Sequence, residues 1–472
     1  MRQDLPPGMR VERVHGWAEV EYVDCLVARA TDLESLRAVL DHCRAKGLGL
    51  VPRGGGYTFG DMFTNRDGVV LDTRAMNRVK TWDPATGRLT AEPGVTIGDV
   101  LRLGLPAGWV LPACPGGKNV TMAGALGNNV HGKDSWKFGN FVECVQCFTL
   151  LLADGSLRRV DREADPAVFH AAAGGMGLLG VVTEITIQLH RPPSVFVAEG
   201  AAVSPNIRRT VEIMEAAKAD TDLLLAWVDA FPGGDAVGRG YVSRGRWLAP
   251  DQAPAWDDAR LEAALSETGK VFGRIPAKPF WFVGRPFFRP LFLRQANRLA
   301  YFLRRRGGDT APAGAAMFAD HNFVHNKIPE LIHVFRPYGL AEFQVLYPGA
   351  DAGDKLARLL EFCRRLGMCS LLAGTKAHRA DASPLSFAGD GYSFSVDLQL
   401  RGRNMSRFKE DSARLLDLVV RDGGKCFLAK DRFLTREHFQ AMYPEHVQFL
   451  KTKAELDPDG LFTSDMYRRL MA

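Results

Sequence analysis

The sequence predicts an α+β protein rather than a doubly wound α/β sheet, and three observations support this. Strand-like and helix-like apolar patterns follow one another in mixed order along the chain. The chain has 472 residues, 46% apolar and 24% charged, which by length is about three domain equivalents of an ordinary globular protein. The 48 glycines are concentrated in two segments, each of which follows a short strand-like run.

The first part of the chain, residues 1–195, predicts strands interrupted by short helices. Apolar spacing predicts a helix over 33–45, and Thr96 has the side chain of an N-cap for a helix that ends near residue 103. Asp154-Gly155 predicts a hairpin turn. A third helix is predicted over 166–173, and the predicted strands are 48–52, 69–72, 79–82, 89–92, 144–152, 157–160 and 180–189.

Arg191-Pro-Pro193 predicts a boundary, after which residues 196–410 form a second domain. A third part, residues 411–472, is predicted to return to the first domain, with a strand over 426–430 and a helical end. The main strands predicted for the middle are 223–228, 343–347 and 392–400, and its helices are 355–366 and 405–420.

The two Gly-rich segments predict a nucleotide site. Arg53-Gly54-Gly55-Gly56 follows an apolar strand, and consecutive glycines can turn their amides toward one anion. Residues 112–133, rich in Gly, Ala and Asn, leave room for a flat ligand. Gly175-Met-Gly-Leu-Leu-Gly180 matches a dinucleotide fingerprint literally, but a helix precedes it and a strand follows. That order excludes a Rossmann site and predicts a close-packed turn.

Basic and aromatic residues gather in segment 271–306, which holds nine of each and no acidic residue. The whole chain has a net charge of only +6, so the remainder is slightly acidic, and without a recognition motif we expect no nucleic-acid partner. Pro290 predicts the start of a helix that runs to about residue 306. Its apolar face would hold Phe288, Phe292, Leu299, Phe302 and Leu303, and another face Arg294, Arg298 and Arg305.

Two interpretations of this segment are open. A basic amphipathic helix with large aromatics is typical of a peripheral membrane contact, but the same pattern suits a helix that covers a core with Arg stems at its edge. Eight scattered cysteines indicate free thiols in a reducing compartment. We expect a cytoplasmic protein, with a peripheral position on the inner membrane face under the first interpretation. No metal site is predicted.

Together these segments resemble the FAD-binding oxidoreductases of the vanillyl-alcohol-oxidase type. The resemblance implies a two-part FAD-binding domain, completed by the C-terminus, with an inserted α+β substrate domain built on an antiparallel sheet. Leu456-Asp-Pro-Asp-Gly-Leu-Phe462 resembles the closing motif of that family. Tyr57 stands where covalent members carry a flavin-linked His, and no His lies within 53–61, so the implied FAD is non-covalent.

Within the family, the chain is most similar to the members that oxidise a polyprenyl-phosphate-linked ribose. The implied reaction is oxidation of a secondary alcohol of the sugar by hydride transfer to flavin N5, the first half of a 2′-epimerisation, with a short-chain reductase as partner. The motifs that carry this similarity include Gly16-Trp17, Pro115-Gly116, His131-Gly132-Lys133, Phe138-Gly139-Asn140, Pro384-Leu385-Ser386-Phe387, Ala429-Lys430-Asp431 and Ser464-Asp465-Met466.

The resemblance also implies the residues of the site. On the cofactor side they are Arg53, Gly54, Gly55, Gly56, Tyr57, Thr58, Gly60, Asp61, Pro115, Gly116, Thr121, Ala123, Gly124, Ala125, Asn128, Asn129, His131, Gly132, Val182 and Phe427. On the substrate side they are Lys133, Phe59, Gln344, Glu342, Lys376 and Ser395. Either Lys430 or His131 is the base that takes the alcohol proton, and the lysines can face a phosphate or an alkoxide.

Three positions depart from the pattern of those members. Ser395 stands in place of a pocket cysteine, Phe59 in place of a tyrosine, and Glu342 in place of a glutamine. All three belong to the substrate side, so the exact sugar stays open. One alternative is a soluble sugar-alcohol or lactone oxidase that uses O₂, and another is a non-catalytic binding protein.

Overall fold

Apolar segments near the N-terminus form a mixed four-stranded sheet in the order β1-β2-β4-β3. The computed structural model describes residues 8–266, 269–271, 274–323, 330–371 and 373–472. All five residues of β4 are buried, because α1 covers the sheet with the apolar face that its spacing predicts. The elements are β1 (Met9–His15), β2 (Tyr22–Arg29), α1 (Leu33–Lys46), β3 (Gly49–Arg53) and β4 (Gly68–Asp72).

A second, antiparallel sheet has the order β5-β6-β9-β7-β8. Thr96 caps α2 through a capping box with Asp99, which confirms the predicted start of that helix. The strands are β5 (Val79–Asp83), β6 (Arg88–Ala91), β7 (Val145–Leu151), β8 (Leu157–Asp161) and β9 (Val181–Gln188). The helices of this part are α2 (Ile97–Gly104), α3 (Met122–Gly127), α4 (Ser135–Phe138) and α5 (Pro166–Ala172).

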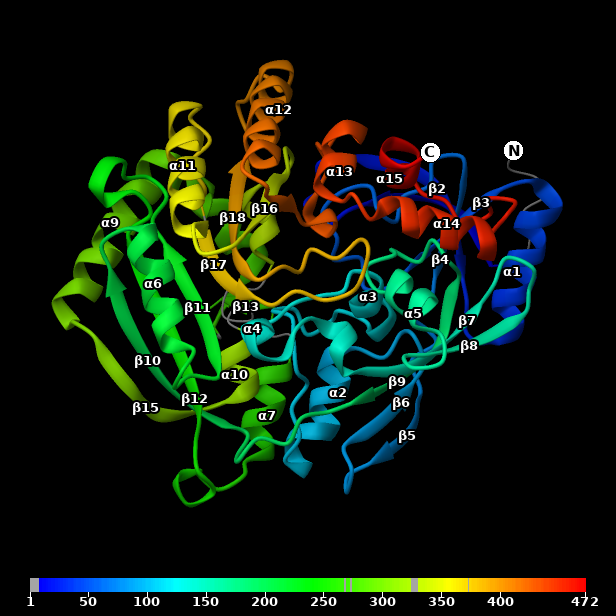
Figure 1. Ribbon diagram of the computed structural model, residues 1–472, viewed down its shortest axis with the longest axis horizontal. Helices are drawn as coiled ribbons and strands as arrows, with labels where there is room; N and C mark the ends of the chain where they lie inside the picture. Colours follow the sequence, from blue (N-terminus) through cyan, green and yellow to red (C-terminus); the bar gives the residue numbers. More distant parts are fainter. Residues whose placement is uncertain (1–7, 267–268, 272–273, 324–329, 372) are drawn as a thin grey trace.

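The middle of the chain forms an eight-stranded antiparallel sheet in the order β15-β10-β12-β11-β17-β18-β16-β19. Figure 1 shows it on the left, in green to orange, and the first two sheets on the right. The strands are β10 (Phe196–Ser204), β11 (Leu223–Val228), β12 (Gly240–Trp247), β15 (Thr310–Met317), β16 (Leu340–Pro348), β17 (Ala373–His378), β18 (Gly391–Gln399) and β19 (Lys425–Cys426). Its helices include α6 (Ile207–Ala217), α7 (Asp258–Leu265), α10 (Phe318–Asn322), α11 (Ala352–Arg365) and α12 (Met405–Arg421).

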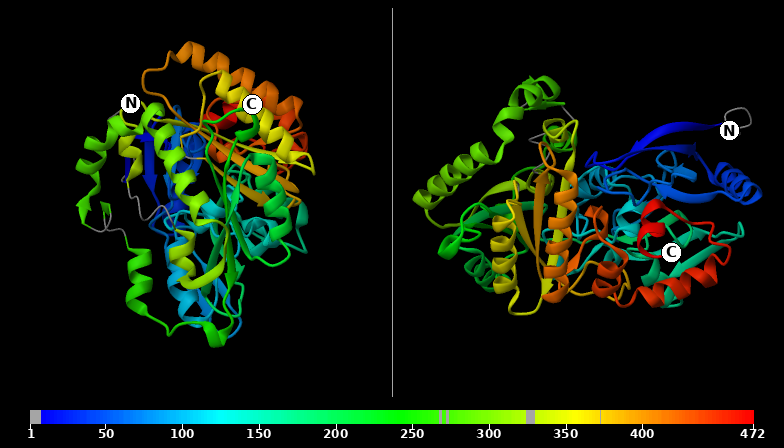
Figure 2. Two further views of the ribbon diagram at one scale, coloured as in Figure 1. Left: turned by 90° about the vertical axis from the view of Figure 1, so that its left-hand side faces the viewer. Right: turned by 90° about the horizontal axis from the view of Figure 1, so that it is seen from above.

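The basic aromatic segment folds into a short hairpin followed by helices at the edge of the molecule (Figures 1 and 2). The predicted helix from Pro290 is confirmed as α9 (Pro290–Gly307). Before it come β13 (Lys270–Val271), β14 (Ile275–Pro276), α8 (Ala277–Gly284) and the 3₁₀ turn η5 (Arg285–Phe288). Residues 272 and 273 lie outside the described residues.

The last part of the chain returns to the first sheet. Leu50 of β3 donates its amide to the carbonyl of Leu461 and accepts the amide of Thr463. Figure 1 shows these C-terminal helices, in red, beside β2 to β4. They are α13 (Arg436–Met442), α14 (His446–Leu456) and α15 (Asp465–Leu470).

The strand predicted over 426–430 is wrong. β19 ends at Cys426, and the 3₁₀ turn η8 (Leu428–Lys430) follows. The amide of Phe427 donates to the carbonyl of Gln344, and the amide of Lys430 then turns back to the carbonyl of Phe427. This turn, not a strand, sets the position of Lys430.

The domain boundaries at 195 and 410 stay predictions. The eight-stranded sheet begins at Phe196, but β19, beyond residue 410, belongs to the same sheet. Among the helices of the described chain, none combines the length and apolar character that crossing a membrane requires.

Candidate active site

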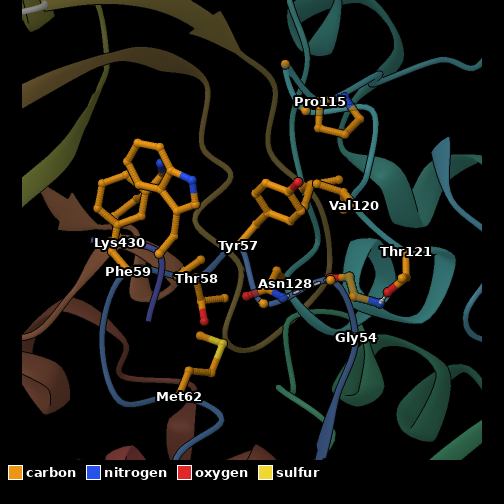
Figure 3. A pocket seen from close by; sticks show the side chains of 18 of the residues that line it. Gly54, Tyr57, Thr58, Phe59, Met62, Pro115, Val120, Thr121, Asn128 and Lys430 are labelled. Atoms are coloured by element: carbon orange, nitrogen blue, oxygen red, sulfur yellow. Dashed lines mark hydrogen bonds between the residues drawn. The ribbon is translucent and has the colours of Figure 1, made fainter. Parts of the chain in front are cut away.

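A cavity of about 1110 Å³ lies where the three sheets meet. Its wall includes the loop after β3, the segment before α3, the turn before β9, the inner ends of β16 to β18, and η8. Figure 3 shows Gly54 and Thr121 at one end and Phe59 and Lys430 at the other, with Tyr57 between them. The volume exceeds that of a typical small-ligand pocket, so the cavity has space for a dinucleotide and a second molecule.

The first Gly-rich loop packs so closely against the start of α3 that no side chain fits at Gly54 or Gly55. A Cβ atom at Gly54 would lie 2.2 Å from Oγ1 of Thr121, and one at Gly55 would lie 2.5 Å from the carbonyl of Asn119. Thr121 caps α3 by accepting the amide of Gly124. The two Gly-rich segments of the sequence therefore form one continuous wall, because glycine allows this close approach.

Unpaired buried polar atoms along this wall indicate a polar ligand. Nε of Arg53, Oγ1 of Thr58 and Oδ1 of Asn128 are buried, and none has a hydrogen-bond partner among the described residues. Buried polar groups in native proteins are nearly always paired. FAD offers phosphate, ribityl and ring groups to these atoms, so the residues present fit this cofactor.

Most of the predicted site residues line the cavity. On the cofactor side these are Arg53, Gly54, Gly55, Gly56, Tyr57, Thr58, Pro115, Gly116, Thr121, Ala123, Gly124, Asn128, His131, Val182 and Phe427. On the substrate side they are Phe59, Glu342, Gln344, Lys376, Ser395 and Lys430. Their positions are thus brought together, while their individual roles stay predictions.

Six predicted residues lie outside the cavity wall: Gly60, Asp61, Ala125, Asn129, Gly132 and Lys133. The carboxylate of Asp61 is instead paired with Arg469 at 2.8 Å and with Arg432 at 3.5 Å. A Cβ at Gly60 would lie 1.9 Å from the carbonyl of Asp431. These two residues therefore join the first loop to the C-terminal part of the chain.

The side chains of Asn129 and Lys133 bind residues of the middle part of the chain. The amide nitrogen of Asn129 donates to Asp381 at 2.7 Å and to Ser386 at 3.1 Å. Nζ of Lys133 donates to the carbonyl of His321. Neither residue is part of the cavity wall, and the contact of Lys133 with substrate stays a prediction.

The last two of the six are held by packing. Ala125 is fully buried on α3. A Cβ at Gly132 would lie 2.8 Å from the backbone nitrogen of Cys114. Each supports the wall from behind without reaching the cavity.

Lys430 lies at the substrate end of the cavity. Its Nζ is 3.5 Å from the centroid of the Phe59 ring and 3.2 Å from a carboxylate oxygen of Glu342. A cation over an aromatic face and beside a carboxylate is held by both. Two of the three positions that depart from the family pattern, Phe59 and Glu342, thus contact the same amine.

His131 lies in a buried network beside this amine. Its Nε2 is 3.1 Å from the side-chain amide of Gln344, and its Nδ1 is 3.5 Å from Nζ of Lys376. The rings of His378 and Phe427 pack around it at 4.9 and 5.3 Å. Burial, then the charge of Lys376, lowers the pKa of His131 well below its usual value, so the imidazole is neutral at pH 7.

Lys376 on β17 carries the clearest shift among the cavity amines. Burial, then the positive charge of Lys430, lowers the pKa of Lys376 to about 8, while Glu342 acts in the opposite direction. The side chain is therefore mostly protonated at pH 7 and loses its charge just above it. Such an amine suits an anionic group of a ligand.

Asp397 lines the cavity but is absent from the predicted residues. It lies opposite Glu342 in the β16–β18 pairing, just as Ser395 lies opposite Gln344. The sequence contained the information needed to find it: alternate residues of a strand face the same side, and Asp397 follows the predicted site residue Ser395 by two positions. Trp17 was also missed; its ring packs on Phe59 at 4.8 Å.

Comparison with known proteins agrees with this arrangement. Residues 25–161 match the model of the FAD binding domain, and residues 401–470 match that of D-arabinono-1,4-lactone oxidase. The chain is 27% identical to decaprenylphosphoryl-beta-D-ribose oxidase of Mycolicibacterium smegmatis, over 97% of both chains. It is 30% identical to an uncharacterised Streptomyces coelicolor protein from the mprA 5′ region, over 80% of this chain and all of that one.

A shorter match, 28% identity over 183 residues, is to L-gulonolactone oxidase of Bos taurus, of which it covers 41%. The chain belongs to the FAD-binding oxidoreductases of the vanillyl-alcohol-oxidase (PCMH) type. It is an FAD-dependent oxidoreductase that acts on CH–OH groups, of the sugar-alcohol and lactone oxidase kind.

Proposed function

We propose that the protein binds FAD non-covalently and oxidises a secondary alcohol of a pentose linked through phosphate to a polyprenyl chain. The observation that carries this proposal is the pair of amines, Lys376 and Lys430, at the substrate end of the cavity. Two amines beside a neutral imidazole suit a ligand that brings both a phosphate and a hydroxyl group. Similarity to a decaprenylphosphoryl-beta-D-ribose oxidase over nearly the whole chain supports the same substrate class.

The residues divide the work of the oxidation. FAD, when bound, supplies the acceptor for the two electrons that leave the carbinol carbon. We assign the base role to Lys430, because both ring nitrogens of His131 already contact Gln344 and Lys376. Lys430 acts in its unprotonated form: the neutral amine takes the hydroxyl proton, and Glu342, 3.2 Å from Nζ, stabilises the ammonium that results.

His131 then has an orienting role. Its neutral imidazole holds the side-chain amide of Gln344, 3.1 Å from its Nε2, so that the oxygen of that amide can accept a hydrogen bond from a sugar hydroxyl without adding charge to the site. Lys376, charged below pH 8, binds the phosphate. The ketone product needs a reductase that returns it as the epimer, and we propose a short-chain reductase as partner and the cytoplasmic face of the membrane as location.

Anaerobic mixing with a polyprenyl-phosphoryl pentose tests the proposal. We expect the visible flavin band to bleach, and we expect Lys430→Met to slow bleaching by about 10²–10⁴-fold, the usual contribution of a base, with FAD still bound. Lys425→Met is the matched control, since Lys425 does not line the cavity. Equal rates for Lys430→Met and Lys425→Met would remove Lys430 from the reaction.

A second candidate is oxidation of a free sugar lactone or polyol with O₂. The match of residues 401–470 to the D-arabinono-1,4-lactone oxidase model favours it. Bleaching by D-arabinono-1,4-lactone, with none by the lipid-linked pentose, would replace the first candidate by the second.

A further inference from the structure

We propose that α8, η5 and α9, residues 277–307, form an arm that docks on an anionic membrane surface and holds the cavity beside the bilayer. The inference rests on the proposed function for the reason a membrane is needed, but its structural basis is a separate surface. None of the residues that line the cavity belongs to the arm.

The arm exposes an unusual amount of apolar surface. Half of the large apolar side chains that are exposed in the described part of the chain lie on it: Phe282, Val283, Phe287, Leu291, Phe292, Leu299, Phe302 and Leu303. Phe282 is 67% exposed and Leu291 is 68% exposed. Tyr301 is the one buried residue of α9, at 8% exposure, so the interpretation of this helix as a core cover is not supported. Contiguous exposed apolar residues mark an interaction surface.

Basic residues flank the apolar face of α9. Leu291, Phe292, Leu299, Phe302 and Leu303 cover about a third of the helix circumference, at spacings of three and four residues. Arg294, Arg298 and Arg305 follow along one border of that face, and all three are exposed. A helix with this division lies in the plane of a membrane interface, with apolar side chains in the acyl boundary and arginines at the phosphates.

The arm is attached to the wall of the cavity. Trp281 and Ala277 of α8 belong to the same apolar cluster as Phe59, and the Nζ of Lys430 lies over the ring of Phe59. The guanidinium of Arg285 donates to the carbonyl of His333, a cavity-lining residue of the 3₁₀ turn η7 (Leu331–Val334). A membrane that binds the arm would therefore lie close to the substrate end of the cavity.

The positive charge of the arm favours an anionic bilayer, rather than a second copy of the chain, as the partner of its apolar face. In a two-fold dimer the same patch meets itself, so the basic side chains of one arm would face those of the other. The segment 271–306 has nine basic residues and no acidic one to offset that repulsion. Negatively charged lipid headgroups can pair with these basic side chains, and the acyl chains can cover the apolar face.

Sedimentation of the FAD-loaded protein with vesicles tests the inference. We expect binding to vesicles of phosphatidylglycerol and phosphatidylcholine in equal parts, weaker binding as salt is raised, and little binding to phosphatidylcholine alone. Arg294→Gln, Arg298→Gln and Arg305→Gln together should lower partitioning by roughly 100-fold, since each basic residue near such a surface contributes about a factor of five. Phe287→Ser, Leu291→Ser and Phe302→Ser together should also abolish it.

Matched controls separate the arm from general charge and hydrophobicity. Arg407→Gln, Arg414→Gln and Arg421→Gln remove three exposed arginines from α12, and Val447→Ser removes an exposed apolar residue from α14. Both should bind vesicles as the wild type does. All variants should still be bleached by a water-soluble, short-chain phosphoryl pentose, which shows that they are folded.

The outcomes also separate this inference from the proposed function. Vesicle binding that depends on the arm, without bleaching by the lipid-linked pentose, would support the membrane-docking role of the arm and contradict the proposed substrate. No vesicle binding, or binding unchanged in both arm variants, would overturn the arm. A dimer in solution that the arm variants convert to monomer, without vesicle binding, would replace the bilayer by a second copy.

Discussion

Glu342 and Asp397 lie directly opposite each other on β16 and β18, inside the cavity. Burial, then the charge of Glu342, raises the pKa of Asp397 well above its usual range. Glu342 also pairs with Lys430 at 3.2 Å. Two carboxyl groups and two lysines thus share the substrate end of the cavity, and both Glu342 and Lys430 act on the pKa of Lys376.

The pH dependence of anion binding follows from this cluster. Because the pKa of Lys376 is about 8 and only its protonated form attracts an anion, inhibition by inorganic phosphate should weaken as pH rises through 8. Glu342→Gln removes the negative charge that raises this pKa. The pH at which phosphate inhibition is half lost should therefore move down by about one pH unit. Lys430→Met removes the positive charge that lowers it, so the midpoint should move up. Steady-state inhibition measured from pH 6 to 10 checks all three.

The two opposite shifts are the discriminating part of that experiment. A midpoint that is the same in the wild type and both variants would mean that a group outside this cluster binds the anion. Lys376→Met should remove the pH dependence altogether, and its persistence would contradict the assignment to Lys376.

Most of the residues that sequence reasoning assigned to the site line the cavity, and those outside it share a physical pattern. The resemblance implies a substrate-side position for Lys133, but its Nζ donates to the carbonyl of His321. Asn129 adopts a positive φ of 42° and turns its amide to Asp381. The sequence does not record such side-chain directions, because contacts from distant segments determine them.

At the scale of elements, α14 is fixed by a buried ion pair. Nζ of Lys453 lies 2.7 Å from the carboxylate of Asp457 and donates to the carbonyls of Leu178 and Phe462. The same carboxylate accepts the amides of Leu461 and Phe462. This pair connects the closing motif of the chain to the Gly-rich turn before β9.

Breaking this pair should be costly. Lys453→Met leaves the Asp457 carboxylate buried without its cation, so we expect a loss of about 3–5 kcal/mol in the free energy of unfolding. Lys451→Met, at an exposed position on the same helix, is the control and should stay within about 0.5 kcal/mol of the wild type. Urea unfolding of the FAD-loaded protein measures both. Equal midpoints would show that the pair contributes no net stability.

Elements with local signals were predicted well. α1 and α2 carry apolar periodicity and N-caps, and β9 alternates, so each was predicted within a residue or two of its observed bounds. The turn η8 was predicted as a strand, but after Phe427 the chain bonds to itself: the amides of Lys430 and Asp431 donate to the carbonyls of Phe427 and Leu428. The two faces of α9 were visible in the sequence, but its exposure to solvent required the structure.

At the scale of the whole molecule, FAD would contact segments from every part of the fold. The cavity takes its wall from residues 52–63 and 115–131, from the turn before β9, from the eight-stranded sheet and from η8. A ligand that binds only the folded state stabilises all of these together.

Removing FAD should therefore lower the melting temperature of the entire protein. At free FAD about 100 times its dissociation constant the stabilisation is roughly 2.7 kcal/mol, which at an unfolding entropy of about 2.1 cal/mol/K per residue corresponds to a shift of roughly 3 °C for a chain of this size. Differential scanning fluorimetry of the holo and apo forms measures it. Acid precipitation should leave the flavin in the supernatant, and flavin retained in the pellet would contradict the non-covalent binding expected from Tyr57.

The return of the chain to its first sheet has a consequence for biosynthesis. The loop after β3 is translated early, but Phe427 and Lys430, which complete the cavity, and Phe462, which joins β3, are translated long after it. The Gly-rich wall therefore cannot become part of the complete cavity until residues 427–430 have been made. A premature stop codon between residues 162 and 426 would yield a polypeptide that retains the whole FAD binding domain match at residues 25–161 and still cannot enclose the cofactor.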